Sequence, residues 1–204
     1  METFHAGLID CMESATRDVL AEFVAAVAFV QSDEASFLFF QSTLKSELPF
    51  NGRAQKIESV IASAFTLAFN HASMVLDEQY RWRATFDARA WSVPNREEAG
   101  NYFLWRERDA TKNSIASLAQ SAFSHKQLHG KHTGDMTAML EAAGIRWDEL
   151  EDRKKRGSFF RRGTYEPSPG VIRSRTERID MPPFGRVMNR AAVLFDGETP
   201  LLQP

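Results

Sequence analysis

The feature that most constrains the fold is a pair of short apolar segments joined by a very short polar turn. Residues 26–31, AVAFVQ, and residues 35–41, ASFLFFQ, have the composition of strands, and only the tripeptide SDE at 32–34 separates them. A connection of that length predicts an antiparallel hairpin. Apolar residues at helical spacing from residue 7 to about residue 26 predict a helix directly before the hairpin.

Several further elements follow the hairpin. A helix that Asn51 can cap, a strand at 83–94, a helix from Arg96 to about residue 122, a helix at 133–144, and exposed strands at 158–166 and 171–179 are predicted. Asn95 and Glu98 have the spacing of a capping box at the start of the long helix. The order helix-strand-strand-helix-strand-helix predicts an α+β fold with a ferredoxin-like antiparallel sheet, helices packed on it, and helical and small β additions at the C-terminal end.

The predicted order lacks one element of that fold. A βαββαβ unit needs a strand before its first helix, yet only six residues precede Gly7. We therefore expect the first strand to be missing and the sequence to be truncated at its N-terminus. We divide the chain into an incomplete catalytic core at 1–130 and a basic extension at 131–204 within the same globular unit.

The charges are unevenly distributed along the chain. Residues 1–50 hold eight acidic and two basic side chains, whereas residues 151–178 hold nine basic and four acidic ones. This split indicates an acidic end that carries chemistry and a basic end that meets an anionic polymer, with ordinary solvated charge as the alternative. Cys11 is the only cysteine, which excludes an intrachain disulfide and suits the reducing cytoplasm. The longest apolar run contains Glu22 and is too short for a membrane span.

Asp33 and Glu34 are the first candidate site residues. Two adjacent carboxylates at a strand junction repel each other unless a cation or a base neutralises them. Oxygen ligands on a rigid hairpin suit Mg²⁺, as in two-metal polymerase sites. An ordinary hairpin turn, in which Asp is common, is the alternative.

Two helical positions extend the list of candidates. Arg53 and Lys56 share one face at a predicted helix N-terminus, an arrangement that favours a bound phosphate, with a solvated face as the alternative. Arg106, Asp109 and Asn113 follow one side of the long helix and need either partners or solvent.

Basic residues in the C-terminal half form the last group. His125 and His129 have a spacing that permits metal binding on a helix, but without a third ligand a zinc site is disfavoured. Lys126 and Lys131 could contact phosphates or face solvent. The run RKKRGSFFRR at 153–162 interleaves basic and aromatic side chains, which is typical either of nucleic-acid contact or of a loop entering a core strand.

Taken in order, five segments resemble the tRNA-histidine guanylyltransferase family, in particular its bacterial and phage guanylyltransferase-like branch. They are QSDEASFLF, GRAQK, TFDARAWSVPNREEAGNYFLWRERDATKNSI, FSHKQLHGK and KRGSFF, and the resemblance covers most of residues 7–162. It implies a polymerase-palm-like fold and addition of nucleotides, GTP favoured over ATP, in the 3′-to-5′ direction to the 5′ end of tRNA. It also implies a cytoplasmic homo-oligomer, a tetramer.

The resemblance assigns roles to individual residues. Asp33 would be a carboxylate ligand of two Mg²⁺ ions, with Ser32 contacting nucleotide and Glu34 supporting the site. Arg53 and Lys56 would contact the triphosphate. Arg89, Asp109 and Asn113 would line the region that binds the RNA and the second nucleotide. Lys126 and Lys131 would contact RNA or phosphate.

The sequence departs from the family pattern in two places. The eukaryotic His-Ile-Asn-Asn motif is replaced by residues 111–114, TKNS, which resembles the bacterial relatives that repair truncated tRNA with templated nucleotides. The family's first strand, with an IDGR-like segment and a second metal-binding Asp, has no counterpart. We therefore expect weak or no catalysis, with a non-catalytic tRNA-binding remnant or an assembly subunit as alternatives.

Overall fold

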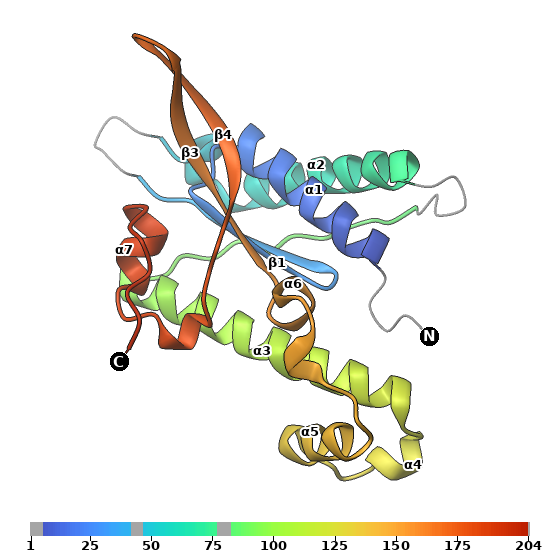
Figure 1. The fold of residues 1–204 in the computed structure, drawn as a ribbon. Helices are drawn as coiled ribbons and strands as arrows, with labels where there is room; N and C mark the ends of the chain where they lie inside the picture. Colours follow the sequence, from blue (N-terminus) through green and yellow to red (C-terminus); the bar gives the residue numbers. More distant parts are fainter. Residues whose placement is uncertain (1–5, 42–46, 77–82, 204) are drawn as a thin grey trace.

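A computed structural model describes residues 6–41, 47–76 and 83–203, and its centre is an antiparallel sheet in the order β2-β1-β3-β4 (Figure 1). Helix α1 spans Ala6–Glu22 and leads into β1, Val27–Gln31, and β2, Glu34–Leu38. The two strands pair from Val27↔Leu38 to Gln31↔Glu34, so Ser32 and Asp33 alone form the turn. The α+β fold and the hairpin predicted from the sequence are confirmed.

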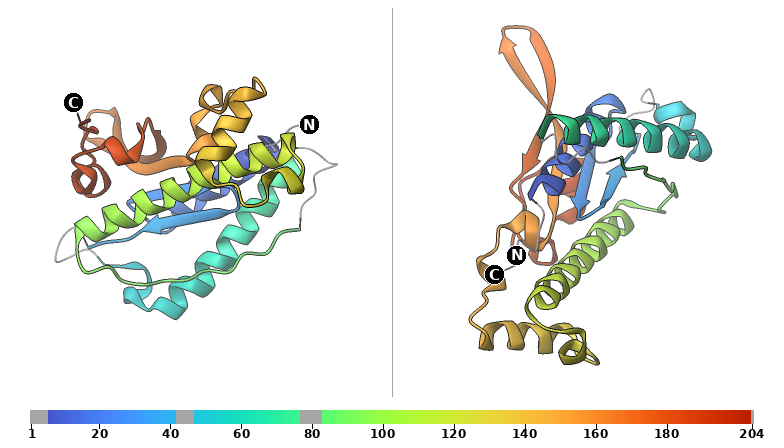
Figure 2. Two further views of the ribbon diagram at one scale, coloured as in Figure 1. Left: turned by 90° about the horizontal axis from the view of Figure 1, so that it is seen from below. Right: turned by 90° about the vertical axis from the view of Figure 1, so that its right-hand side faces the viewer.

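Helices cover both faces of this sheet, because side chains alternate along each strand. Helices α1 and α2, Ala54–Leu76, pack on the face that carries Ala28, Val30 and Phe160. The opposite face carries Phe29 and Phe159 and is covered by α3, Arg96–Ala122, and α7, Arg190–Phe195, together with the short helix η4, Phe184–Arg186. Figure 2 shows α3 and the C-terminal elements on the side away from α2.

A third apolar cluster lies beyond the sheet, around the C-terminal half of α3. Helices α4, His125–Leu128, and α5, Thr133–Ala142, pack there with Ile115, Leu118 and Ala119. The chain then passes through η3, Trp147–Glu149, and α6, Asp152–Lys155, back to the sheet (Figure 1).

Strands β3, Ser158–Ser168, and β4, Val171–Ile179, are longer than the hairpin strands. β3 pairs with β1 only between Ser158 and Arg161, and from there to its tip it pairs only with β4 among the described residues. The central sheet thus takes strands from both sides of residue 130, and the division of the chain at that residue stays a prediction.

The predicted strand at 83–94 is wrong. This segment is extended and alternately exposed, but it belongs to no strand. Its backbone is held by helix α2 instead: the N–H groups of Ala84, Phe86 and Ala90 donate to Asn70 Oδ1, Thr66 Oγ1 and Glu58 Oε1 at 2.9, 3.0 and 2.8 Å. An extended segment hydrogen-bonded to helix side chains has the same alternation as a strand.

Of the two helix caps predicted from the sequence, one is absent from the structure and one is present. Asn51 does not cap α2, because it has a left-handed φ of 56° inside the short helix η1, Pro49–Gly52, and α2 begins at Ala54. Asn95 does cap α3, its side chain accepting the Glu98 N–H at 2.8 Å. Among the described helices none has a stretch long and apolar enough to span a bilayer.

Candidate functional site

The hairpin turn lies at one end of the sheet, between the first turns of α1 and the middle of α3. Ser32 adopts a left-handed φ of 50°, which is unfavourable for a residue with a side chain and which accumulates at functional sites. Asp33 is exposed and makes no hydrogen bond or ion pair with the described residues. Its carboxylate is therefore available to a ligand.

Glu34 has a different environment from Asp33. It forms an ion pair with Arg106 of α3, whose side chain is only 9% exposed, and also accepts from Gln31 Nε2 at 3.0 Å. Arg106 also forms an ion pair with Asp109 at 3.4 Å, and Asp109 accepts a hydrogen bond from Asn113 Nδ2 at 3.4 Å. The predicted row on α3 thus ties the hairpin to the helix. Glu34 is exposed like Asp33, but unlike Asp33 it is held by an ion pair to α3.

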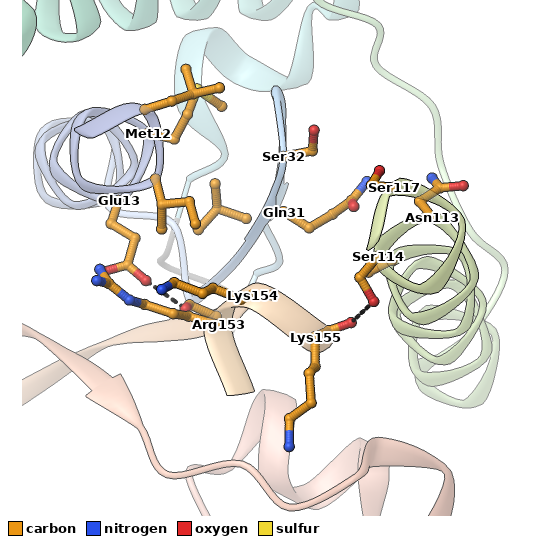
Figure 3. Close-up of a pocket in the computed structure, with 16 residues that line it drawn as sticks. Met12, Glu13, Gln31, Ser32, Asn113, Ser114, Ser117, Arg153, Lys154 and Lys155 are labelled. Carbon is orange, nitrogen blue, oxygen red and sulfur yellow. Dashed lines mark hydrogen bonds and ion pairs between the residues drawn. The ribbon is translucent and has the colours of Figure 1, made fainter. Parts of the chain in front are cut away.

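A cavity of about 170 Å³ opens beside this turn, between α1, the end of β1, α3 and the segment 153–157 (Figure 3). Leu8, Met12, Val30 and Ala110 give it apolar walls. Its polar lining has Ser32, Asn113 and Ser117 on one side. On the other side lie Glu13, Arg153, Lys154 and Lys155. The Lys155 ammonium is directed away from the cavity, to the Asp148 carbonyl oxygen at 2.8 Å and to Asp152 at 3.2 Å (Figure 3). Ser32 and Asn113, two of the residues predicted to contact nucleotide, therefore share one cavity.

The basic segment on the rim is fixed by contacts from three directions. Arg153 bonds Asp10 at 2.5 Å and Glu151 at 2.9 Å, and the hydrogen bond to Asp10 raises the pKa of Arg153 above its usual value. On the other side, the Ser114 hydroxyl shares its proton between the Thr111 and Lys155 carbonyl oxygens, at 2.9 and 3.0 Å, and accepts from Trp147 Nε1 at 3.0 Å. Among the described residues Lys154 pairs only with exposed Glu151, at 3.3 Å, and Figure 3 shows it beside the cavity.

Gly157 explains how this segment comes so close to the hairpin. Its φ is +81°, and a Cβ on it would lie 2.5 Å from the Val30 carbonyl oxygen and 2.8 Å from the Phe29 ring. Only glycine allows the chain to pass from Lys155 into β3 at this distance from β1. The basic residues consequently reach the same end of the sheet as Ser32.

Arg53 and Lys56 lie at the other end of the sheet. Arg53 Nε donates to the Phe50 carbonyl oxygen, Lys56 lies over the Phe50 ring, and that ring packs on Phe23. Phe23 directly follows α1 and precedes the Val27 end of β1. The five residues of β1, which span about 16 Å, separate this end from the turn. The structure does not bring these two cations to Asp33.

The other predicted RNA-binding residues also lie outside the cavity. Arg89 is 85% exposed and pairs with Asp87 at 3.7 Å. Lys126 and Lys131 are exposed around α4, beyond the C-terminal end of α3. The rings of His125 and His129 lie 6.3 Å apart between centroids, and their roles, like those of the lysines, stay predictions.

The described residues do not fit a two-metal site. No group of three or more His, Cys, Asp or Glu side chains among them is placed to hold an ion. Glu34 is engaged by Arg106, which leaves Asp33 as the carboxylate open at the turn. One carboxylate with nucleotide phosphates does match the way a single Mg²⁺ is commonly bound.

The sequence did not single out Arg153, Lys154 and Lys155 as neighbours of Ser32. These residues belong to the basic run RKKRG, which we interpreted either as a nucleic-acid contact or as a loop that enters a core strand. The glycine at its end was the specific clue, because it permits the close approach to β1.

Comparisons with known proteins identify relatives for most of the chain. A family model described as tRNAHis guanylyltransferase matches residues 3–94. A probable tRNA(His) guanylyltransferase of Dictyostelium discoideum is 32% identical over 166 residues, which cover 74% of this chain and 63% of that protein. Matches in Acanthamoeba polyphaga mimivirus, mouse and Drosophila melanogaster cover 60%, 53% and 57% of those proteins, so the chain spans little more than half of their length.

Two solved structures agree with this match. A bacterial tRNA(His) guanylyltransferase-like protein in complex with ATP superimposes with a TM-score of 0.79 and 33% identity, covering 89% of this chain and 76% of that one. A structure of such a protein in complex with GTP gives a TM-score of 0.74 and 30% identity, covering 91% and 76%.

Proposed function

Because the chain belongs to the tRNA(His) guanylyltransferase family, we propose that it is a tRNA nucleotidyltransferase that binds a nucleoside triphosphate beside Ser32. The observation that carries the proposal is the cavity at the hairpin turn, which joins Ser32 and Asn113 to a group of cations. Structures related to this chain hold ATP and GTP, which supports the choice of ligand.

The cavity divides the nucleotide between two environments. Its apolar walls suit the flat face of a base, while Lys154 and its neighbours suit the phosphates. The cavity is open to solvent, and its volume of about 170 Å³ is below the usual size of a full ligand pocket, roughly 300 Å³, so part of the nucleotide stays outside it. Ser32 and Asn113 then position the nucleotide from the rim.

Mg²⁺ enters this proposal with the nucleotide. Asp33 would hold it, and when bound it supplies neutralisation of the phosphate charge. The chain's own residues position the phosphates: Lys154 binds them, and Glu34 with Arg106 keeps the turn in place. With one open carboxylate among the described residues, we expect weak 3′-to-5′ addition of GTP or ATP, or none.

The remaining assignments extend the proposal along the RNA. Arg53 and Lys56 form a separate phosphate site at the other end of the sheet, and Asp109 acts through Arg106. Exposed cations that could meet tRNA are Arg89, Lys126 and Lys131. We further propose that the protein forms a homo-oligomer, a tetramer, and acts in the cytoplasm.

Nucleotide binding by the purified chain tests the proposal. Titration with a fluorescent GTP analogue and Mg²⁺ should show saturable binding, weakened about tenfold by Lys154→Ala, because a charge-assisted hydrogen bond contributes roughly 1.5–3 kcal/mol. Lys112→Ala, which removes an exposed lysine of α3, is the matched control and should bind normally. If both variants bind the GTP analogue with equal affinity, the cavity is not the nucleotide-binding site.

A second function, a tRNA-binding remnant without catalysis, is favoured by the engagement of Glu34 with Arg106. In that case tRNA affinity survives Asp33→Ala, and no radiolabelled nucleotide is added to a 5′-truncated tRNA in Mg²⁺. Robust Mg²⁺-dependent addition by the wild-type chain excludes it.

A further inference from the structure

The β3-β4 ribbon stands away from the rest of the molecule, as Figure 1 and the right view of Figure 2 show. Beyond Arg162 each of its strands pairs only with the other among the described residues. The residues from Thr164 to Ser168 and from Val171 to Arg175 are exposed, so both faces of this part are open. With 11 residues, β3 extends about 36 Å from Ser158, which lines the cavity, to the tip.

The two faces of the ribbon differ in charge. Residues alternate between faces, and the pairing register places opposite residues on the same face. The face continuing from Phe159 carries Arg161, Gly163, Tyr165, Arg173, Arg175 and Glu177. The face continuing from Phe160 carries Arg162, Thr164, Glu166, Ile172, Ser174 and Thr176. The second face also carries Arg178, which lies opposite Phe160 at the base of the ribbon. The first face thus has three arginines against one glutamate and the second has two against one, and towards the tip, from residue 163 to residue 175, both arginines, Arg173 and Arg175, lie on the first face.

Contacts on the first face leave part of that charge without a partner. Glu177 is shared between Arg161 at 2.8 Å and Arg175 at 3.5 Å, and Arg161 holds the pKa of Glu177 below its usual value. Arg175 also lies over the Tyr165 ring, 5.4 Å from its centroid. Arg173, directly opposite Tyr165 in the register, makes no hydrogen bond or ion pair with the described residues.

This combination fits a phosphodiester backbone with accessible bases. A guanidinium binds phosphate oxygens through two parallel N–H groups, and a tyrosine ring supplies a stacking surface. We propose that the Arg173–Arg175–Tyr165 face of the ribbon binds RNA at a distance from the nucleotide cavity. The inference rests on the proposed tRNA substrate, because an RNA with its 5′ end at Ser32 needs further contacts along its length.

The test compares charge removal on the two faces. An Arg173→Ala/Arg175→Ala double variant, which removes two positive charges, is compared with Arg162→Ala, which removes one from the opposite face. Binding of a tRNA transcript is measured between 50 and 200 mM salt, with circular dichroism as the check on folding. Loss of two phosphate contacts should lower the slope of log K against log salt by about 1.5, and the affinity at 0.1 M salt by about 30-fold. Arg162→Ala should stay within about twofold of the wild type.

Two results overturn the inference. One is an equal affinity loss per arginine in the double variant and in Arg162→Ala, which means unspecific charge. The other is unchanged RNA binding with a changed sedimentation coefficient in the double variant, which means that the ribbon joins protein molecules. GTP affinity, measured on the same variants, separates the two proposals. It should remain at the wild-type value in each variant, whether or not RNA binding changes. If the wild-type chain binds no GTP, only the proposal of a nucleotide site in the cavity is contradicted.

Discussion

Gly157 offers the sharpest test of how the basic segment reaches the hairpin. Replacing it by alanine adds one methyl group at a φ of +81°, pointing at the Val30 carbonyl oxygen 2.5 Å away and at the Phe29 ring 2.8 Å away. Gly170 is the matched control. Its φ is +79°, and a Cβ there would meet nothing within 4 Å.

The two variants separate the cost of the left-handed backbone from the cost of the steric overlap. Gly170→Ala carries only the left-handed backbone cost, about 1 kcal/mol. Gly157→Ala adds an overlap with the backbone of β1 and with a buried ring, and overpacking of this kind costs roughly 1–3 kcal/mol. We therefore expect Gly157→Ala to lower the free energy of unfolding by about 3 kcal/mol.

Urea denaturation followed by circular dichroism measures both variants against the wild type. The expected result is a midpoint for Gly157→Ala well below that of Gly170→Ala, with similar slopes. If the two variants lose the same stability, the close approach of the basic segment to β1 is refuted.

The remaining predictions concern three polar side chains. Glu34→Gln should lower the free energy of unfolding by about 1 kcal/mol in urea denaturation, because it removes the charge that pairs with the buried Arg106, while the exposure of Glu34 to solvent screens the pair. Ser114→Ala should weaken binding of the fluorescent GTP analogue about fivefold, because the Lys155 carbonyl loses a hydrogen bond worth roughly 1 kcal/mol. Burial raises the pKa of Glu107 above its usual 4.5, so the folded state binds this proton more tightly than the unfolded state. Its contribution to stability should fall as pH rises from 4.5 through the raised pKa, and thermal melts of Glu107→Gln should lack that fall.

Local patterns predicted the elements whose backbone partners lie nearby in sequence. The short connection at residues 32–34 between two apolar segments predicted a hairpin, and Asn95 marked the start of α3. A strand-like pattern without a nearby partner failed at 83–94. Its alternate burial arises against α2, and neither its hydrogen-bond acceptors nor a pairing strand can be inferred from the alternation itself.

The candidate site depends on contacts between distant residues, which a single sequence does not reveal. Glu34 and Arg106 are 72 residues apart, and no spacing rule links them. The position of Lys154 depends on the packing of α6 against α3 through Ser114 and Trp147. Asp33, in contrast, could be predicted as available, because a two-residue turn has little room to bury a side chain.

The central claim is that the cavity beside Ser32 holds the nucleotide. A crystal structure of the chain with Mg²⁺ and a non-hydrolysable GTP analogue tests it directly. Our account predicts the base against Met12 and Ala110, with phosphates within hydrogen-bond distance of Lys154. Phosphate density confined to Arg53 and Lys56, with nothing in the cavity, would contradict it.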